Sequence, residues 1–297
     1  MILFIQQLVN GLRIGSIYAL VALGYTMVYG IIRLINFAHG DFIMVGGYTL
    51  LFTMPLMNSL GLPLWISVIF AIIVCIIVGV SVEQIAYKPV RKASTISALI
   101  TAIAVSLFIQ NLSLMVIGSA PRPITRLFRV PRIKIDSLNL NLDGNALVTI
   151  AIGLGVMLIL NLIVGKTKVG KAMRAVSEDS QAAILMGINV NKTITKTFVL
   201  GSGLAAIASL MYVNSYPQLT PFLGAMLGLK AFVSAVLGGI GIIHGAMLGG
   251  LIIGFVETMT KAYISSTYGD AVVFGILIIV LLIKPSGIFG KNVGEKV

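Results

Sequence analysis

The stretch that decides the fold runs from Ile14 to Ile32 and reads IGSIYALVALGYTMVYGII. These 19 residues carry no charge, and they follow directly on Arg13. An α-helix needs roughly 20 apolar residues to cross the hydrocarbon layer of a bilayer. A secretory signal peptide has a shorter apolar core and then a small-residue cleavage site, which is absent here. The stretch therefore predicts a retained transmembrane helix.

The rest of the chain repeats this apolar pattern. Of 297 residues, 58% are hydrophobic and 10% charged, and the mean hydropathy is +1.06. Soluble domains carry about 25% charged residues, so we expect lipid to be the outer solvent. The apolar stretches are Ile14–Ile32, Phe42–Met57, Leu64–Val82, Ile96–Ile117, Ala146–Val164, Phe198–Val213, Leu227–Ile243, Ala246–Ile264 and Ala271–Ile283. We predict an all-α integral membrane protein, one transmembrane domain over residues 1–297, with eight to nine transmembrane helices, some of them discontinuous.

The basic residues predict how the chain is oriented. The net charge is +12, and the lysines and arginines fall in short segments between apolar runs, which favours membrane orientation and anionic lipid over nucleic acid. One topology places 13 of the 21 basic residues in the cytoplasm: Arg33, Lys88, Arg91, Lys92, Lys166, Lys168, Lys171, Arg174, Lys192, Lys196, Lys284, Lys291 and Lys296. It puts the N-terminus outside, the C-terminus inside, residues 165–196 in the cytoplasm, and residues 118–144 outside despite their arginines.

Two interrupted apolar regions are candidates for the transport pathway. Asn36, His39 and Asp41 stand next to one break, and a second break contains Gly238, Gly239, Gly241 and His244. Backbone groups freed at such breaks can line a polar cavity, and ionisable groups at membrane depth are usually functional. Two ordinary turns are an equally good explanation, and Asp41 could instead cap a helix starting at Phe42.

Other features have structural interpretations. Gly241, Gly245 and Gly249, and likewise Gly250 and Gly254, are spaced by four, which allows close helix packing. Glu257 and Lys261 form an i,i+4 pair that we interpret as structural.

Several chemistries are excluded by what the chain lacks. Cys75 is the single cysteine, so an internal disulfide or a thiolate metal site is not expected. The segment from Gly165 to Ala172 nearly matches a phosphate-binding loop, but it follows a transmembrane stretch and Ala172 has no hydroxyl for Mg²⁺. We therefore expect no metal and no cofactor on this chain, and no enzymatic activity.

The segment Lys166–Asn189 is basic and amphipathic. Met173–Met186 mixes apolar residues with Arg174, Glu178 and Asp179, and Gly187 can end a helix there. Such a helix could lie on the membrane surface or offer its face to a cytoplasmic partner.

Three motifs, in order along the chain, resemble the LivH-type permeases of bacterial branched-chain amino acid ABC importers. They are Ile35-Asn-Phe-Ala-His-Gly-Asp41, Ser177-Glu-Asp-Ser-Gln-Ala-Ala183 with Met186-Gly-Ile-Asn189, and Gly238-Gly-Ile-Gly241 with His244-Gly-Ala-Met-Leu-Gly-Gly250. The resemblance covers about Val9 to Gly290. Members of that family often have a proline near the position of His244, which is a departure in this chain.

The resemblance implies the ABC importer permease fold and a set of partners. They are a second, related permease forming a heterodimer, two cytoplasmic ATPases that carry ATP and Mg²⁺, and a periplasmic binding protein for leucine, isoleucine or valine, all at a bacterial inner membrane. It also implies that the cytoplasmic segment docks on an ATPase through Arg174, Glu178, Asp179, Ala182, Ala183 and Gly187. The outer loop would receive the binding protein through Arg122, Arg126, Arg129 and Arg132.

Some alternatives stay open at this point. Relatives in the same superfamily carry urea, amides, ribose-like sugars or nucleosides. From other classes, a stand-alone transporter or channel would need no partner, and an intramembrane enzyme would depend on His39 or Asp41 without needing ATP.

Overall fold

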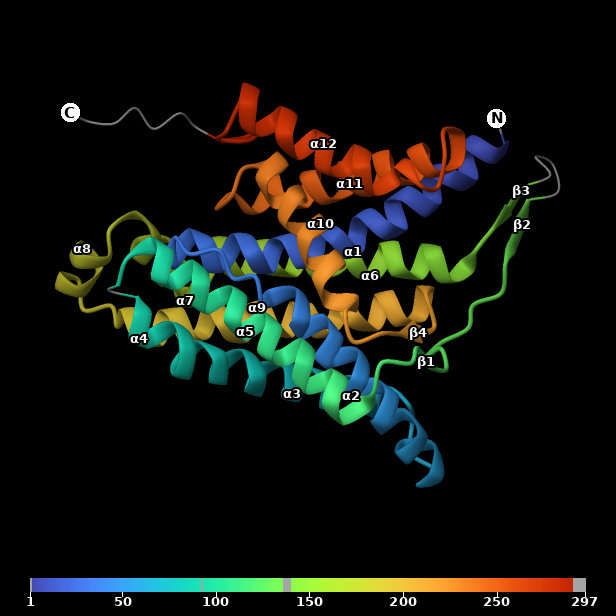
Figure 1. The fold of residues 1–297 in the computed structure, drawn as a ribbon, viewed down its shortest axis with the longest axis horizontal. Helices are drawn as coiled ribbons and strands as arrows, with labels where there is room; N and C mark the ends of the chain where they lie inside the picture. Colours follow the sequence, from blue (N-terminus) through green and yellow to red (C-terminus); the bar gives the residue numbers. More distant parts are fainter. Residues whose placement is uncertain (1, 92, 136–139, 291–297) are drawn as a thin grey trace.

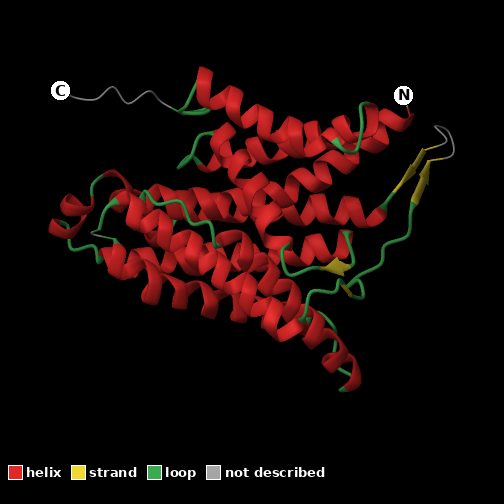
Figure 2. Ribbon diagram, in the orientation of Figure 1, coloured by secondary structure: helices red, strands yellow, loops and turns green. Residues whose placement is uncertain are grey.

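Helices make up most of the computed structural model, which describes residues 2–91, 93–135 and 140–290 (Figures 1 and 2). They are α1 (Ile2–Ile32), α2 (His39–Ser59), α3 (Ile66–Val82), α4 (Lys88–Val90), α5 (Thr95–Ile117), α6 (Gly144–Lys166), α7 (Lys168–Glu178), α8 (Ser180–Leu185), α9 (Val190–Ser215), α10 (Leu223–Gly238), α11 (Ile243–Tyr263) and α12 (Tyr268–Ile283). A π-helical turn, η1 (Glu83–Tyr87), joins α3 to α4. The strands described are β1 (Arg122–Pro123), β2 (Ile133–Ile135), β3 (Leu140–Leu142) and β4 (Gln218–Leu219); β1 pairs with β4 and β2 with β3, both antiparallel. The predicted all-α fold is confirmed.

The number of helices that can cross a membrane is slightly lower than predicted. Within the described residues, seven helices are long and apolar enough to span, with α3, η1 and α4 counted as one. The other two apolar helices, α10 and α12, have 16 residues each. At 1.5 Å per residue they are about 24 Å long, shorter than the roughly 30 Å hydrocarbon layer. Every predicted apolar stretch contains a helix, although Leu227–Ile243 runs past the end of α10 at Gly238, and seven helices of the described residues have the length of a full crossing.

The first predicted span, α1, is the central helix of the bundle. It packs against α6, α9, α10 and α11, and all its residues from Gly15 to Val28 are buried. Gly250 and Gly254 of α11 lie against Ala19 and Gly15 of α1, so closely that a Cβ on either glycine would overlap the α1 backbone. The expected role of this glycine pair in close helix packing is confirmed.

The outer helices expose apolar side chains. Ile77 of α3, Phe108 of α5 and Leu158 of α6 are each more than half exposed. A soluble protein rarely exposes apolar surface of this extent. These faces suit contact with lipid.

Different helices, strands and loops gather at the two ends of the bundle (Figure 1). One end gathers α4, α7, α8, the end of α1 and the segment after α12. The opposite end gathers the N-terminus, the loop with β1, β2 and β3, and the turn between α2 and α3. The described parts of the basic segments that we predicted to share one side do lie at one end, and residues 118–135 and 140–144 lie at the other. Lys92, Lys291 and Lys296 lie outside the described residues.

Candidate functional site

The chain turns back into the bundle after α1. Residues 33–38 run from the end of α1 to the middle of the molecule, so α2 begins in the interior (Figure 1). Asn36, His39 and Asp41 are all buried there. His39 packs against Gly24, with its ring 5.0 Å from that of Tyr25 between ring centroids. The first predicted break therefore lies inside the protein.

Asp41 does not cap α2, in contrast to one of the two explanations we considered. The helix begins at His39, which leaves Asp41 within the first turn. Its carboxylate accepts hydrogen bonds from Ser106 Oγ at 2.5 Å and from Gln110 Nε2 at 2.9 Å, both on α5. A buried carboxylate needs donors, and α5 supplies them from outside the helix that carries Asp41. This residue therefore connects α2 to α5.

The second predicted break is a packed turn at the end of the bundle. Gly238 lies against Gly245 so closely that a Cβ on either would overlap the other's backbone, and the amide of Phe289 donates to the Gly238 carbonyl. Gly239 and Gly241 have φ of 106° and 93°, values that favour glycine. His244 is exposed at the start of α11.

The start of α10 lies against the start of α2 in the interior. Gly224 and Gly228 of α10 contact Gly40 of α2, and neither Gly40 nor Gly224 leaves room for a Cβ on the other. Sequence spacing did not reveal this close packing of the Gly40 and Gly224 backbones.

The amphipathic segment forms two helices instead of the single helix that we predicted. Asp179 ends α7 and caps α8, with its Oδ1 accepting from the amides of Gln181 at 2.7 Å and Ala182 at 3.0 Å. Gly187 follows with φ of 81°, so the predicted helix end there is confirmed. In α8, Ala183 is buried, whereas Leu185 is 87% exposed.

The remaining residues of this segment have clear positions. Glu178, Asp179 and Ala182 are exposed, and Arg174 donates to the carbonyls of Val164 and Gly165. Ser177 Oγ donates to the Gly30 carbonyl at the end of α1. The segment is therefore attached to both α6 and α1 while α8 projects from the end of the bundle (Figure 1).

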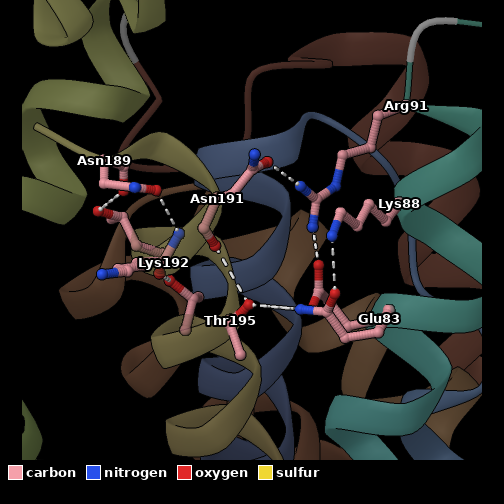
Figure 3. Close-up of polar contacts among 10 residues, drawn as sticks. Glu83, Lys88, Arg91, Asn189, Asn191, Lys192 and Thr195 are labelled. Carbon is pink, nitrogen blue, oxygen red and sulfur yellow. Dashed lines mark hydrogen bonds and ion pairs between the residues drawn. The ribbon is translucent and has the colours of Figure 1, made fainter.

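A buried ion pair that we did not foresee lies beside this segment (Figure 3). Glu83 is fully buried and pairs with Arg91; it also accepts from Thr195 Oγ1 at 3.0 Å. Arg91 donates to Asn191 Oδ1 at 2.9 Å, and burial lowers the pKa of its guanidinium. We call Glu83, Arg91, Asn191 and Thr195 the clamp. It ties the η1 region to the start of α9, and a lone acid at the end of an apolar run was its only signal in the sequence.

The predicted docking loop is anchored at the opposite end. Arg122 of β1 lies opposite Leu219 of β4 in the antiparallel pair, and the Ile124 amide donates to the Pro217 carbonyl at 3.2 Å. The arginines are Arg122, Arg129 and Arg132, which are exposed, and Arg126, which is partly buried. Residues 136–139 of this loop lie outside the described part of the chain.

A second buried glutamate lies towards the same end. The expected pair of Glu257 and Lys261 is confirmed, with 2.5 Å between Oε1 and Nζ. Lys230 of α10 also contacts Glu257 Oε1 at 2.7 Å and Asp270 Oδ1 at 2.7 Å, and Tyr18 donates to Glu257 Oε2 at 2.7 Å. We call these five residues the charge cluster. Lys230, a lone charge in an apolar stretch, was the sequence signal that we missed.

Comparison with known proteins identifies the family of this chain. Residues 7–282 match the family described as the branched-chain amino acid transport system permease component. The high-affinity branched-chain amino acid transport system permease protein LivH of Salmonella typhimurium is 43% identical, over 99% of this chain and 98% of its own length. The corresponding protein BraD of Pseudomonas aeruginosa is 42% identical with the same coverage. The ribose import permease protein RbsC of Haemophilus influenzae is 25% identical over 94% of this chain and 84% of its own. This chain belongs to the family of branched-chain amino acid transport permeases.

Proposed function

We propose that this chain is the permease subunit of an ATP-driven ABC importer of branched-chain amino acids in a bacterial inner membrane. The observation that carries the proposal is the near full-length similarity to permease proteins of high-affinity branched-chain amino acid transport systems. The chain forms half of the pathway and pairs with a second, related permease. A periplasmic binding protein delivers leucine, isoleucine or valine. Two cytoplasmic ATPases bind ATP and Mg²⁺, and this chain binds neither.

In this proposal, the end with α7 and α8 faces the cytoplasm and contacts an ATPase. Ile184, Leu185 and Met186 are 59%, 87% and 81% exposed at the tip of the segment. Exposed apolar side chains beside the charged Glu178 and Asp179 suit a groove on a protein partner. The coupling residues of this surface are Arg174, Glu178, Asp179, Ala182 and Gly187, and Ala183 holds α8 against the bundle.

A series of contacts through the clamp offers a route from this surface to the interior. Asn189 Oδ1 caps α9 by accepting from the Lys192 amide at 3.0 Å, and the clamp begins two residues later. On the other side of the clamp, Tyr87 donates to Asn36 Oδ1 at 2.6 Å. Packed elements linked in this way can transmit a displacement. Movement of α8 would thus reach residues 33–38 and His39, which border the pathway together with Asp41, the glycines of the 238–241 turn and His244.

The opposite end receives the binding protein. Arg122, Arg126, Arg129 and Arg132 give the loop a positive surface, and acidic groups on a partner would complement it and raise the rate of encounter. Charge reversal of the three exposed arginines should weaken docking while leaving membrane assembly intact.

Reconstitution of the complete importer in proteoliposomes tests the function. We expect ATP-dependent uptake of labelled leucine that isoleucine and valine inhibit and that urea and ribose do not. Leu185→Glu should abolish co-purification of the ATPases, whereas Lys171→Gln, on the same segment but away from the apolar tip, should not. Uptake by this chain alone without ATP would establish a stand-alone transporter instead, and uptake of ribose or urea in preference to leucine would establish a different substrate class.

A further inference from the structure

A cavity of about 480 Å³ opens beside the charge cluster. Small-molecule sites usually measure roughly 300–1,000 Å³. Four helices contribute to its wall. They supply Ile14, Ile17, Tyr18, Tyr212, Leu223, Met226, Leu227, Lys230, Glu257 and Lys261, and the α9–α10 connection adds Tyr216, Thr220 and Phe222.

Charged side chains line part of the cavity. Lys230 and Glu257 are both buried and both line it, while Lys261 lines it with its side chain 40% exposed. With Asp270 included, the cluster contains two lysines and two carboxylates. Its formal charge is therefore zero. A ligand with a net charge would unbalance the cluster, whereas a zwitterion would not.

Apolar side chains also line the cavity. Ile14, Ile17, Leu223 and Leu227 provide aliphatic surface there, and Tyr212 adds an aromatic ring. An aliphatic α-amino acid carries a carboxylate, an ammonium group and an apolar side chain on one carbon. This cavity presents partners for all three groups: lysine for the carboxylate, glutamate for the ammonium and aliphatic side chains for the third. A sugar or urea has neither a carboxylate nor an ammonium group to offer to the lysines and the glutamate.

The wall of the cavity adjoins the docking loop. Tyr216 and Thr220 line the cavity and flank β4, and β4 pairs with β1 of the loop. Arg13 lies 5.5 Å from the ring centroid of Tyr216 and pairs with Asp143 at the start of α6. The segment that would receive a solute from outside is thus continuous with the cavity wall. Ionisable groups facing hydrocarbon are costly, so the open side of the cavity suits water or another subunit.

We infer that this cavity binds a zwitterionic aliphatic α-amino acid on its way through the permease, with its carboxylate at Lys230 and Lys261 and its ammonium group at Glu257. The inference rests on the proposed function for the direction and energy source of transport. It adds a binding site in the outer half of the bundle, away from His39 and Asp41. Tyr18 positions Glu257 by donating to its second oxygen.

Cysteine protection tests the site directly. Cys75 is buried and donates to the Phe42 carbonyl, so it provides an unreactive background. In the assembled importer, Met226→Cys places a thiol in the cavity wall, and Leu62→Cys places a control thiol in the exposed α2–α3 turn. We expect millimolar leucine to slow modification of position 226 by a charged thiol reagent at least threefold, and to leave position 62 unchanged. Ribose and urea should protect neither position. Equal modification rates at position 226 with and without leucine would overturn the inference.

Transport measurements separate this inference from the proposed function. Glu257→Gln and the cavity-filling Leu223→Trp should each lower leucine uptake at least tenfold and remove the protection of position 226. Thr258→Val, at the next position of α11 but outside the cavity lining, is the matched control and should retain uptake. If the wild-type importer takes up leucine and both cavity variants do so equally well, the inference fails while the proposed function stands. If the wild-type importer takes up no leucine, the proposed function fails first.

Discussion

Among the described residues, two glutamates are buried, and their surroundings differ. Glu83 accepts hydrogen bonds from three side chains, Arg91, Gln84 and Thr195, and is fully buried. Glu257 also accepts from three side chains, Lys230, Lys261 and Tyr18, but it borders a cavity of about 480 Å³. The first has one cationic partner in the described part of the chain. The second belongs to a cluster with two lysines and a second carboxylate.

This difference teaches that burial of a carboxylate does not by itself indicate its role. An ion pair enclosed by protein is weak evidence for stability, yet breaking it is costly because one charge is left alone. In a cluster that opens on a cavity, the other members keep an ion partner when one charge is removed, and the cavity leaves room for a ligand. We therefore expect the clamp to affect stability and coupling, and the charge cluster to affect mainly the handling of solute.

The largest expected effect on stability comes from removing Arg91. Arg91→Leu leaves Glu83 buried without a cation, which should cost about 3–5 kcal/mol of stability. Thermal unfolding in detergent, monitored by size-exclusion chromatography, measures this loss of stability. The double variant with Glu83→Gln removes both charges and should recover most of the loss. A double variant as unstable as the single one would show that the pair does not act as a unit.

Glu257→Gln should destabilise less than Arg91→Leu. Lys230 keeps Asp270 as a partner at 2.7 Å, so no buried lysine is left unpaired. We expect a loss of about 1–3 kcal/mol, the cost of a weakened buried hydrogen-bond network. The same unfolding assay compares the two variants directly, and a larger loss for Glu257→Gln would reverse the comparison.

Thr195→Val tests whether the clamp transmits movement as well as holding the fold. The substitution keeps the shape of the side chain but removes a hydroxyl that donates to Glu83 and accepts from Gln84. We expect a stability loss of about 1–2 kcal/mol. If the proposed coupling route is correct, stimulation of the ATPases by the loaded binding protein should fall severalfold. Thr193→Val is the control, since its hydroxyl bonds to the backbone of Asn189 and not to the clamp. Equal stimulation in both variants would argue against the route.

The smallest stability effects are expected at the exposed rims of the two regions. Lys261 is 40% exposed, and Lys88 is exposed with Gln84 as its hydrogen-bond partner. Ion pairs and hydrogen bonds of exposed side chains contribute roughly 0–1 kcal/mol. Lys261→Gln and Lys88→Gln should therefore change the unfolding temperature very little. A large shift for either would mean that the rim is buried by a partner subunit.

Much of the fold follows from local composition. Runs of uncharged residues such as Ile14–Ile32 must be helical in lipid, because a helix satisfies its own backbone hydrogen bonds. Gly187 ends a helix and the basic segments share one end, as their composition predicted. In contrast, the division between α7 and α8 depends on whether Asp179 caps a new helix or continues the old one, and both options are compatible with the local sequence.

The sequence by itself determined that this chain is a helical membrane protein, and it located the segment that we propose couples to ATPases and the loop at the opposite end. Only the tertiary structure decided which charges meet. Arg91 reaches Asn191 across 100 positions and Tyr18 reaches Glu257 across 239, and the backbone of Gly224 packs against that of Gly40. The length of an apolar stretch depends on consecutive residues, so the sequence alone determines it. Partners of buried charges depend on how closely small residues such as Gly40, Gly224 and Gly254 let the helices pack, and that is a property of the assembled bundle.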